Sequence, residues 1–165
     1  MAPNDTQKIP FPLNWAKYGG VDMRYTNIDL QCTDIMWFGV DVNGYIAAFT
    51  SGGEAFVPEF VCRSVSETEM LEDHFLNHLE KSTDYVLFAE EKDNCLIRDS
   101  KTLSGKGVYC FDVSSDKESD YVLISYPRCP LPVDALPQEI RDLLESHRML
   151  NVFEGSDSVN LDRAL

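Results

Sequence analysis

The sequence predicts a single α+β domain over residues 1–165, in which a mainly antiparallel sheet with two central hairpins packs against two helices, at about 67–80 and 135–149. Three observations support this fold class. Two pairs of apolar segments are each joined by a turn, and two other segments carry apolar residues at helical spacing. A length of 165 residues with 44% hydrophobic content suits one domain with one core.

The two ends of the chain are expected to lie outside the regular structure. Residues 1–14 contain three prolines and few periodic apolar residues, which predicts an extended N-terminal lead-in. Loose alternation of apolar and polar residues then predicts a short strand near 21–26. Residues 154–165 are mostly polar, and we expect this C-terminal tail to fray.

Residues 34–50 predict the first hairpin. Two apolar runs flank Asn43-Gly44, a pair that tolerates the positive φ angles of a type I′ turn. Both arms are apolar on both faces, so we expect this hairpin to be central in the sheet and covered on each side rather than placed at an edge. Trp37 lies in the middle of the first arm and is expected in the core.

The first helix and the segment after it follow this hairpin. Ser66-Glu-Thr-Glu69 matches a capping box, and apolar residues at helical spacing continue it, so a helix is predicted over about 67–80. Residues 90–106 are polar and charged, which predicts a long connection with room for a short turn of helix.

The second hairpin and the second helix complete the fold. Residues 107–113 and 120–126 are apolar segments joined by a six-residue polar linker, which predicts a looser hairpin than the first. Prolines then end the sheet. A helix is predicted from about 135 to 149, with Pro137 in its first turn and one apolar stripe formed by Leu136, Ile140, Leu143 and Leu144.

The charge of the chain disfavours several classes of partner. The net charge is −14, and residues 51–100 alone hold four basic and twelve acidic residues. Nucleic acids and anionic membranes both require cationic contacts, so we expect neither as a partner. No run approaches the roughly 20 apolar residues of a membrane helix. The N-terminus lacks the apolar segment of a signal peptide, so a cytoplasmic location is expected.

The sequence contains no established catalytic or metal-binding motif. The five cysteines are scattered without a Cys-x-x-Cys pair, so we expect reduced, packed thiols. His74 and His78 have the spacing of two metal ligands on a helix, but the residues between them do not form a metalloprotease motif. We therefore expect no metal, no cofactor and no catalytic residue. Cys110 and His74 could still meet in space as a catalytic pair.

Four short motifs carry a resemblance to a known group of proteins. They are Trp37-Phe-Gly-Val-Asp-x-Asn-Gly-Tyr-Ile-Ala-Ala-Phe, Gly52-Gly-x-x-Phe-Val-Pro, Tyr121-x-Leu-Ile-x-Tyr-Pro-x-x-Pro-Leu and Leu136-Pro-x-x-Ile. Over roughly residues 34–145 the chain resembles a bacterial family similar to immunity proteins of polymorphic toxin systems, including the SUKH superfamily. These motifs are structural, so the resemblance transfers no functional residue.

The resemblance implies a non-enzymatic protein that binds and neutralises a toxin. Nuclease toxins are commonly basic because they hold phosphates, so an acidic inhibitor could steer onto such a site and cover it. We expect the partner-binding face among the carboxylates that follow the first hairpin, at Glu67, Glu69, Glu72, Glu90, Glu91 and Asp93.

Two other functions remain open from the sequence. One is a structural module that self-associates through an exposed strand or apolar patch. The other is a small hydrolase that uses a Cys–His or carboxylate pair. A monomer and a homodimer are both compatible with the sequence.

Overall fold

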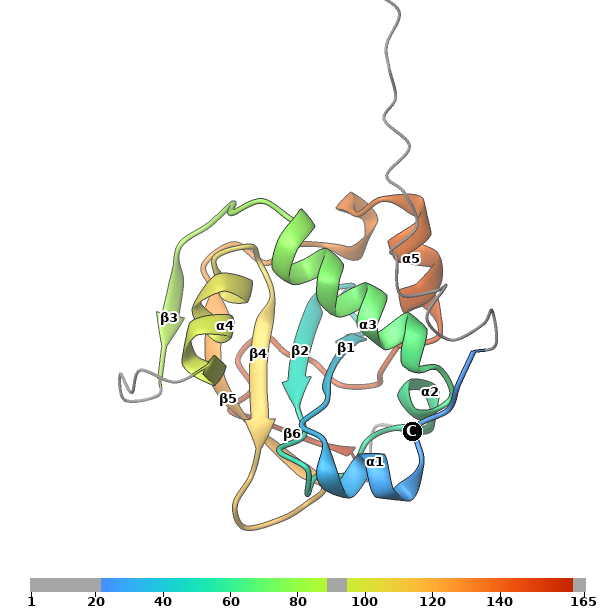
Figure 1. Cartoon of the computed structure of the whole chain (residues 1–165). Coiled ribbons are helices and arrows are strands. Elements are labelled where there is room, and N and C mark those ends of the chain that lie inside the picture. Colours follow the sequence, from blue (N-terminus) through green and yellow to red (C-terminus); the bar gives the residue numbers. More distant parts are fainter. Residues whose placement is uncertain (1–21, 89–94, 162–165) are drawn as a thin grey trace, which may run out of the picture.

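The computed structural model describes residues 22–88 and 95–161, so the predicted lead-in over 1–14 lies outside the described residues. The described residues form one α+β domain, as the sequence predicts (Figure 1). Within them, six strands build a mixed sheet that is mostly antiparallel. The strands are β1 Met36–Val40, β2 Ile46–Thr50, β3 Tyr85–Leu87, β4 Tyr109–Val113, β5 Asp120–Pro127 and β6 Ser158–Asn160.

Both predicted hairpins are present, as β1-β2 and β4-β5. The strand order is β1-β2-β4-β5-β3, and β6 also pairs with β5. β2 and β4 are parallel, because the long segment between them crosses back over the sheet. The helical elements are α1 Asn27–Cys32, α2 Glu59–Cys62, α3 Val65–Asp73, η2 His74–His78, α4 Cys95–Ser104, η3 Val133–Ala135 and α5 Gln138–Glu145.

The turn of the first hairpin is not the predicted type I′ turn. Gly44 has a φ of 81°, but among the described residues only glycines have a positive φ, so Asn43 does not meet the requirement of that turn. The Asp41 carboxylate accepts the N–H groups of Asn43 and Tyr45, each at 2.9 Å. The Gly44 N–H donates to the Asp41 carbonyl at 3.0 Å. These bonds close a longer loop in which Gly44 alone requires a positive φ.

The first hairpin is covered on both faces, as predicted, but it is not central. β1 and β2 are buried throughout, whereas β1 is the last strand of the order. The segment after α5 covers the free edge of β1. The Val40 N–H donates to the His147 carbonyl at 3.0 Å, and the Met149 N–H donates to the Val40 carbonyl at 2.8 Å. A strand edge whose backbone groups are paired in this way is protected from other chains.

The second predicted helix is shorter than expected, and the C-terminal tail is more ordered. α5 ends at Glu145 rather than near 149, because the residues that follow pair with β1. Of its predicted apolar stripe, Leu136, Ile140 and Leu144 are buried and Leu143 is partly buried. The prediction of fraying is wrong for residues 158–161, since β6 pairs with β5 and both Val159 and Leu161 are buried. Residues 162–165 lie outside the described residues.

The first predicted helix is confirmed, with a different cap. The Ser64 hydroxyl, not that of Ser66, accepts the Glu67 N–H at 3.1 Å, and α3 begins at Val65. The Ser66 hydroxyl instead donates to Asp22 at 2.9 Å. The π-helical turn η2 extends α3 to His78, so the two together cover most of the predicted 67–80.

Two helices occupy segments for which the sequence predicts other structure. Residues 22–26 form no strand, and α1 follows them with a capping box between Thr26 and Asp29. α4 occupies much of the predicted connection over 90–106. Its inner face includes Ser100 and Ser104, which are buried. Because these two inner positions are polar, apolar residues do not recur at helical spacing in this segment of the sequence.

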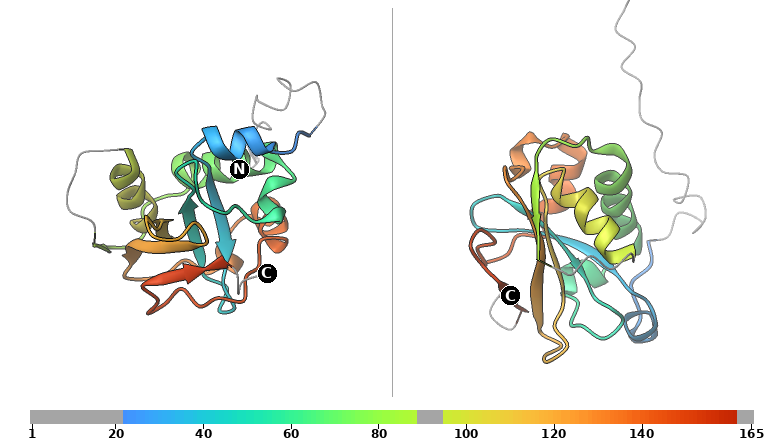
Figure 2. Two further views of the ribbon diagram at one scale, coloured as in Figure 1. Left: turned by 90° about the horizontal axis from the view of Figure 1, so that it is seen from below. Right: turned by 90° about the vertical axis from the view of Figure 1, so that its left-hand side faces the viewer.

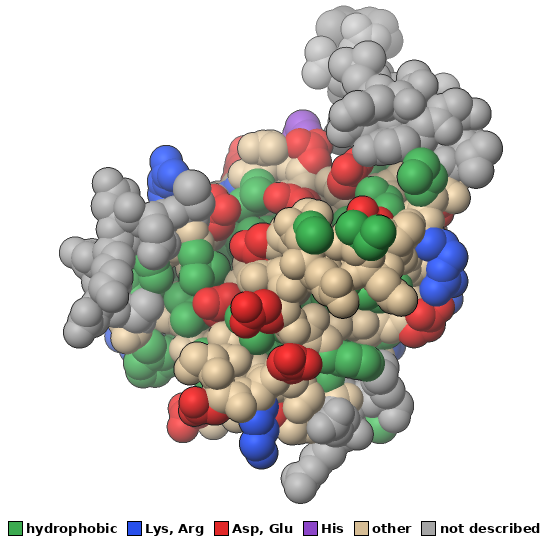
Figure 3. Space-filling view, turned by 60° about the horizontal axis from the view of Figure 1, so that its bottom comes forward, with side chains coloured by type: hydrophobic (Ala, Val, Ile, Leu, Met, Phe, Trp, Pro, Cys, Tyr) green, Lys and Arg blue, Asp and Glu red, His purple; other side chains and the backbone are tan. Residues whose placement is uncertain are grey.

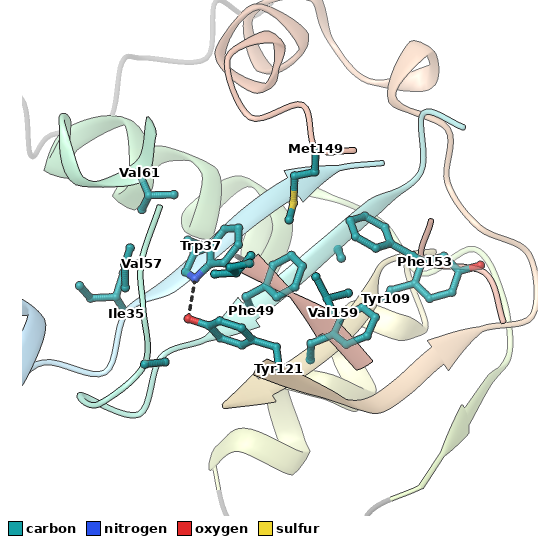
Figure 4. Packing of buried hydrophobic residues seen from close by; sticks show 14 of the residues in the cluster. Ile35, Trp37, Phe49, Val57, Val61, Tyr109, Tyr121, Met149, Phe153 and Val159 are labelled. Atoms are coloured by element: carbon teal, nitrogen blue, oxygen red, sulfur yellow. Dashed lines mark hydrogen bonds between the residues drawn. The ribbon is translucent and has the colours of Figure 1, made fainter. Parts of the chain in front are cut away.

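The sheet separates two hydrophobic cores. Figure 2 shows α3 and α4 on one side of the sheet and the segment with β6 on the other. On this second side, the Trp37 ring stacks on Phe49 with centroids 4.1 Å apart. The Trp37 indole N–H donates to the Tyr121 hydroxyl at 3.3 Å (Figure 4). That hydroxyl donates to the Phe56 carbonyl at 2.8 Å. Trp37 is fully buried, which confirms its predicted place in the core.

Candidate functional site

Three of the predicted partner-binding residues lie on α3. Glu67 is in its first turn, and Glu69 and Glu72 follow along the helix. The other three, Glu90, Glu91 and Asp93, lie outside the described residues. The described part of the predicted face therefore consists of α3 and the elements packed beside it.

α3 and its neighbours bring four carboxylates close together. Four carboxylates act electrostatically on Glu72. They are Asp99 of α4, Glu69, Asp34, which precedes β1, and Asp73, which lies 3.0 Å from His78. We call Asp34, Glu69, Glu72 and Asp99 the acidic surface. The face seen in Figure 3 carries acidic side chains across its centre, while Lys and Arg side chains lie at its margins. The structure thus joins two of the predicted residues with two carboxylates from other segments.

Two carboxylates of the acidic surface, Glu72 and Asp99, occupy an unfavourable environment. Burial raises the pKa of Glu72, and the negative charges of Asp99, Glu69 and Asp34 raise it further. Burial also raises the pKa of Asp99, against a smaller opposing effect of Arg98. One carboxylate oxygen of Glu69, Oε2, is buried without a hydrogen-bond partner among the described residues. Glu72 and Asp99 are therefore partly removed from water, whereas Asp34 is exposed.

Hydrogen bonds fix the segments that carry these carboxylates. Asp34 accepts the Gly52 N–H at 2.7 Å, which ties it to the loop after β2. On α4, the Ser104 hydroxyl lies 2.7 Å from that of Ser125 and donates to the Val108 carbonyl at 2.9 Å. These bonds anchor α4 to the sheet. The carboxylates are thus held by an ordered scaffold and have limited freedom to move apart.

A half-buried aromatic residue adjoins the acidic surface. The pKa of Tyr25 is raised to about 12, first by burial and then by the charges of Glu69 and Glu72. Ile28 of α1 is 72% exposed and Met23 is 51% exposed. Aromatic and apolar groups beside steering charges are typical of protein-binding surfaces.

The sequence did not identify Asp34, Asp99 or Tyr25 as parts of this face. Asp99 could have been found by extending a helical pattern through Leu96, Ser100 and Leu103, since it then lies at the flank of the inner face, where it is half-buried. Asp34 and Tyr25 reach the face through long-range packing, for which the sequence offers no local signal.

The alternative catalytic pair is not formed. The Cys110 thiol is buried among serines, with the Ser104 hydroxyl oxygen 3.7 Å from its Sγ. Burial raises the pKa of Cys110 to about 11, so the thiol is protonated at neutral pH. His74 contacts the Phe75 ring instead, and burial lowers its pKa.

The two helical histidines lie near each other, and Asp73 acts on both. His78 lies 3.0 Å from the Asp73 carboxylate through its Nε2. Within residues 22–88 and 95–161, no group of three or more His, Cys, Asp or Glu side chains could hold a metal ion. Over the same ranges, no helix combines the length and the apolar character needed to cross a membrane.

Comparison with known proteins gives no further guide to the site. Neither protein-family models, nor curated proteins, nor solved structures yield a match to this chain.

Proposed function

We propose that this chain is a non-enzymatic binding protein whose acidic surface engages a basic protein partner, and that it acts as an immunity protein against a nuclease-type toxin. The observation that carries the binding proposal is the group of carboxylates around Glu72, whose pKa is raised by burial and by its acidic neighbours. The toxin as partner rests on the sequence resemblance alone.

The physical basis is the unfavourable energy of the free acidic surface. Glu72 and Asp99 are partly removed from water, so their charges are poorly compensated in the unbound protein. A lysine or arginine side chain from a partner would supply the missing counter-charge and offset this cost. Sites retained for binding often reduce the stability of the free protein, which agrees with such an arrangement.

The charge of the whole chain supports rapid association with a basic partner. A net charge of −14 creates a field that attracts a cationic surface before contact. Such steering raises association rates above the value of roughly 10⁵–10⁶ M⁻¹s⁻¹ for uncharged pairs, and salt weakens it. Four described cysteines carry free thiols, which suits a reducing compartment such as the cytoplasm.

Where a basic toxin domain is encoded beside the gene for this chain, its inactivated form is the partner used in the test. Its association rate is measured with the full chain, with the double variant Glu72→Lys/Asp99→Lys, and with the control Asp134→Lys/Glu139→Lys. Both double variants change the net charge equally, and the control positions are exposed near α5. Circular dichroism verifies that each variant is folded.

We expect the acidic-surface variant to lower the association rate at least about tenfold, and the control to lower it only by the effect of net charge. Equal losses in both variants would show that the acidic surface is not the contact face. Absence of binding by the unmodified chain would overturn the toxin proposal. A stable homodimer in light scattering without any partner would instead favour the self-associating module.

A further inference from the structure

A groove of about 370 Å³ lies on the side of the sheet away from α3 and α4. It opens where two short strands meet the same edge of β5, with β3 pairing at one end of that strand and β6 at the other. Its volume is within the range of small-molecule sites, roughly 300–1,000 Å³. The lining residues that matter here are Phe88, Tyr109, Tyr126, Arg128, Phe153 and Glu154.

Four aromatic rings from four segments line this groove. The Phe88 and Tyr126 centroids are 5.6 Å apart, and those of Tyr109 and Phe153 are 6.0 Å apart. Phe88 is 58% exposed, an unusual state for a phenylalanine that follows a strand. Phe88 and the half-buried Tyr126 therefore offer ring surface to a ligand, whereas the buried rings of Tyr109 and Phe153 close the floor.

The charges near the floor are negative. The pKa of Tyr109 is raised to about 12, first by burial and next by Glu154, and then by Asp41. Glu154 and Asp41 are the negative groups among the neighbours of the Tyr109 hydroxyl. Asp157 adds a second carboxylate to the lining, while Arg128 lines the groove from the end of β5. The end of the groove beside Glu154 is thus both aromatic and anionic.

We propose that this groove binds a small organic cation, whose ammonium group contacts the accessible rings of Phe88 and Tyr126 and is balanced by the carboxylates of Glu154 and Asp157. Ammonium groups are attracted to the negative faces of aromatic rings, and a nearby carboxylate strengthens this attraction. An anionic ligand would meet Glu154 and Asp157 within a strongly acidic protein. The site is separate from the acidic surface and goes beyond the proposed binding function.

The experiment is an amide NMR titration of the full chain with choline. A parallel titration uses 3,3-dimethyl-1-butanol, the neutral analogue in which a carbon atom replaces the nitrogen of choline. The two probes have the same shape and differ in charge. We expect choline to shift the amide signals of residues 153–157 in a saturable manner, and to bind about threefold to tenfold more tightly than the alcohol. Choline also binds less tightly to Glu154→Gln by a similar factor, whereas the control Glu139→Gln on α5 leaves binding unchanged.

Three results would overturn this proposal. They are equal affinities for the two probes, shifts that are spread over the whole surface without saturation, or unchanged choline binding in folded Glu154→Gln. A Tyr126→Leu variant gives an independent check, because it removes one ring of the groove without changing the charge. The outcome does not depend on whether the acidic surface binds a toxin.

Discussion

Replacing Gly107 by alanine tests how tightly β4 is joined to the proline-containing segment after β5. Gly107 has a φ of 97°, a conformation that residues with a side chain rarely adopt. A Cβ atom added there would lie 2.7 Å from the Leu131 Cβ and 2.8 Å from the Leu131 backbone nitrogen. Ordinary contacts between such atoms are about 3.5–4.0 Å, so the backbone would have to move.

The expected loss combines three effects. The backbone conformation costs about 1–2 kcal/mol for a residue with a side chain. Relief of the overlap with Leu131 costs about 1–3 kcal/mol, as in other overpacked sites. The Leu131 N–H donates to the Gly107 carbonyl at 2.9 Å, and weakening this bond costs about 1 kcal/mol. We therefore expect Gly107→Ala to lower the free energy of unfolding by about 4 kcal/mol.

Urea unfolding measures this loss, and Gly155→Ala is the matched control. Gly155 also has a positive φ, of 74°, but a Cβ there would have no neighbour within 4 Å. The control should therefore lose only the conformational cost of about 1–2 kcal/mol. If both variants lose the same free energy of unfolding at an unchanged m-value, Gly107 and Leu131 are not as close as described.

Three further variants test electrostatic features of the fold. Glu72→Gln should raise the free energy of unfolding at neutral pH by about 0.5 kcal/mol, because it removes repulsion at a partly exposed site. The pKa of Glu72 is raised in the fold, so this gain should disappear as the pH falls below about 4. Lys106→Met should cost about 1.5–3 kcal/mol in urea unfolding, because the Lys106 ammonium donates to the Phe75 carbonyl at 2.9 Å and caps the end of the helix. Burial lowers the pKa of His147 in the folded protein. The contribution of neutral His147 to the free energy of unfolding should therefore be fully present above about pH 6.5, and it should decrease as the pH falls toward the pKa of the folded state. Glutamine cannot titrate, so His147→Gln should not show this decrease in the free energy of unfolding at low pH. If the variant and the unmodified chain have the same pH profile of stability, His147 is not the group responsible.

Features set by neighbouring residues were predicted well from the sequence. The apolar arms around Asn43-Gly44 gave the first hairpin, and the apolar stripe ending at Leu144 gave α5. Trp37 was placed correctly, since a large aromatic residue in the middle of a strand with two apolar faces has few places other than the core.

Features set by distant contacts were not predicted. The Asp41 carboxylate accepts the Phe153 N–H at 2.9 Å as well as two N–H groups in its own turn, so the turn conformation depends on the C-terminal segment. α4 was missed because Ser100 and Ser104 are buried where apolar residues would be expected. The acidic surface needed the packing of Asp34 and Asp99 against α3, which no local pattern encodes.

The repulsion within the acidic surface is measured most directly by carboxyl-carbon NMR, with Glu72 titrated in the full chain and in Asp99→Asn. We expect Glu72 to titrate above its ordinary pKa of about 4.3, and its pKa to fall when the charge of Asp99 is removed. An ordinary pKa for Glu72 in the full chain, unchanged in Asp99→Asn, would contradict the clustering of carboxylates on which the proposed binding face depends.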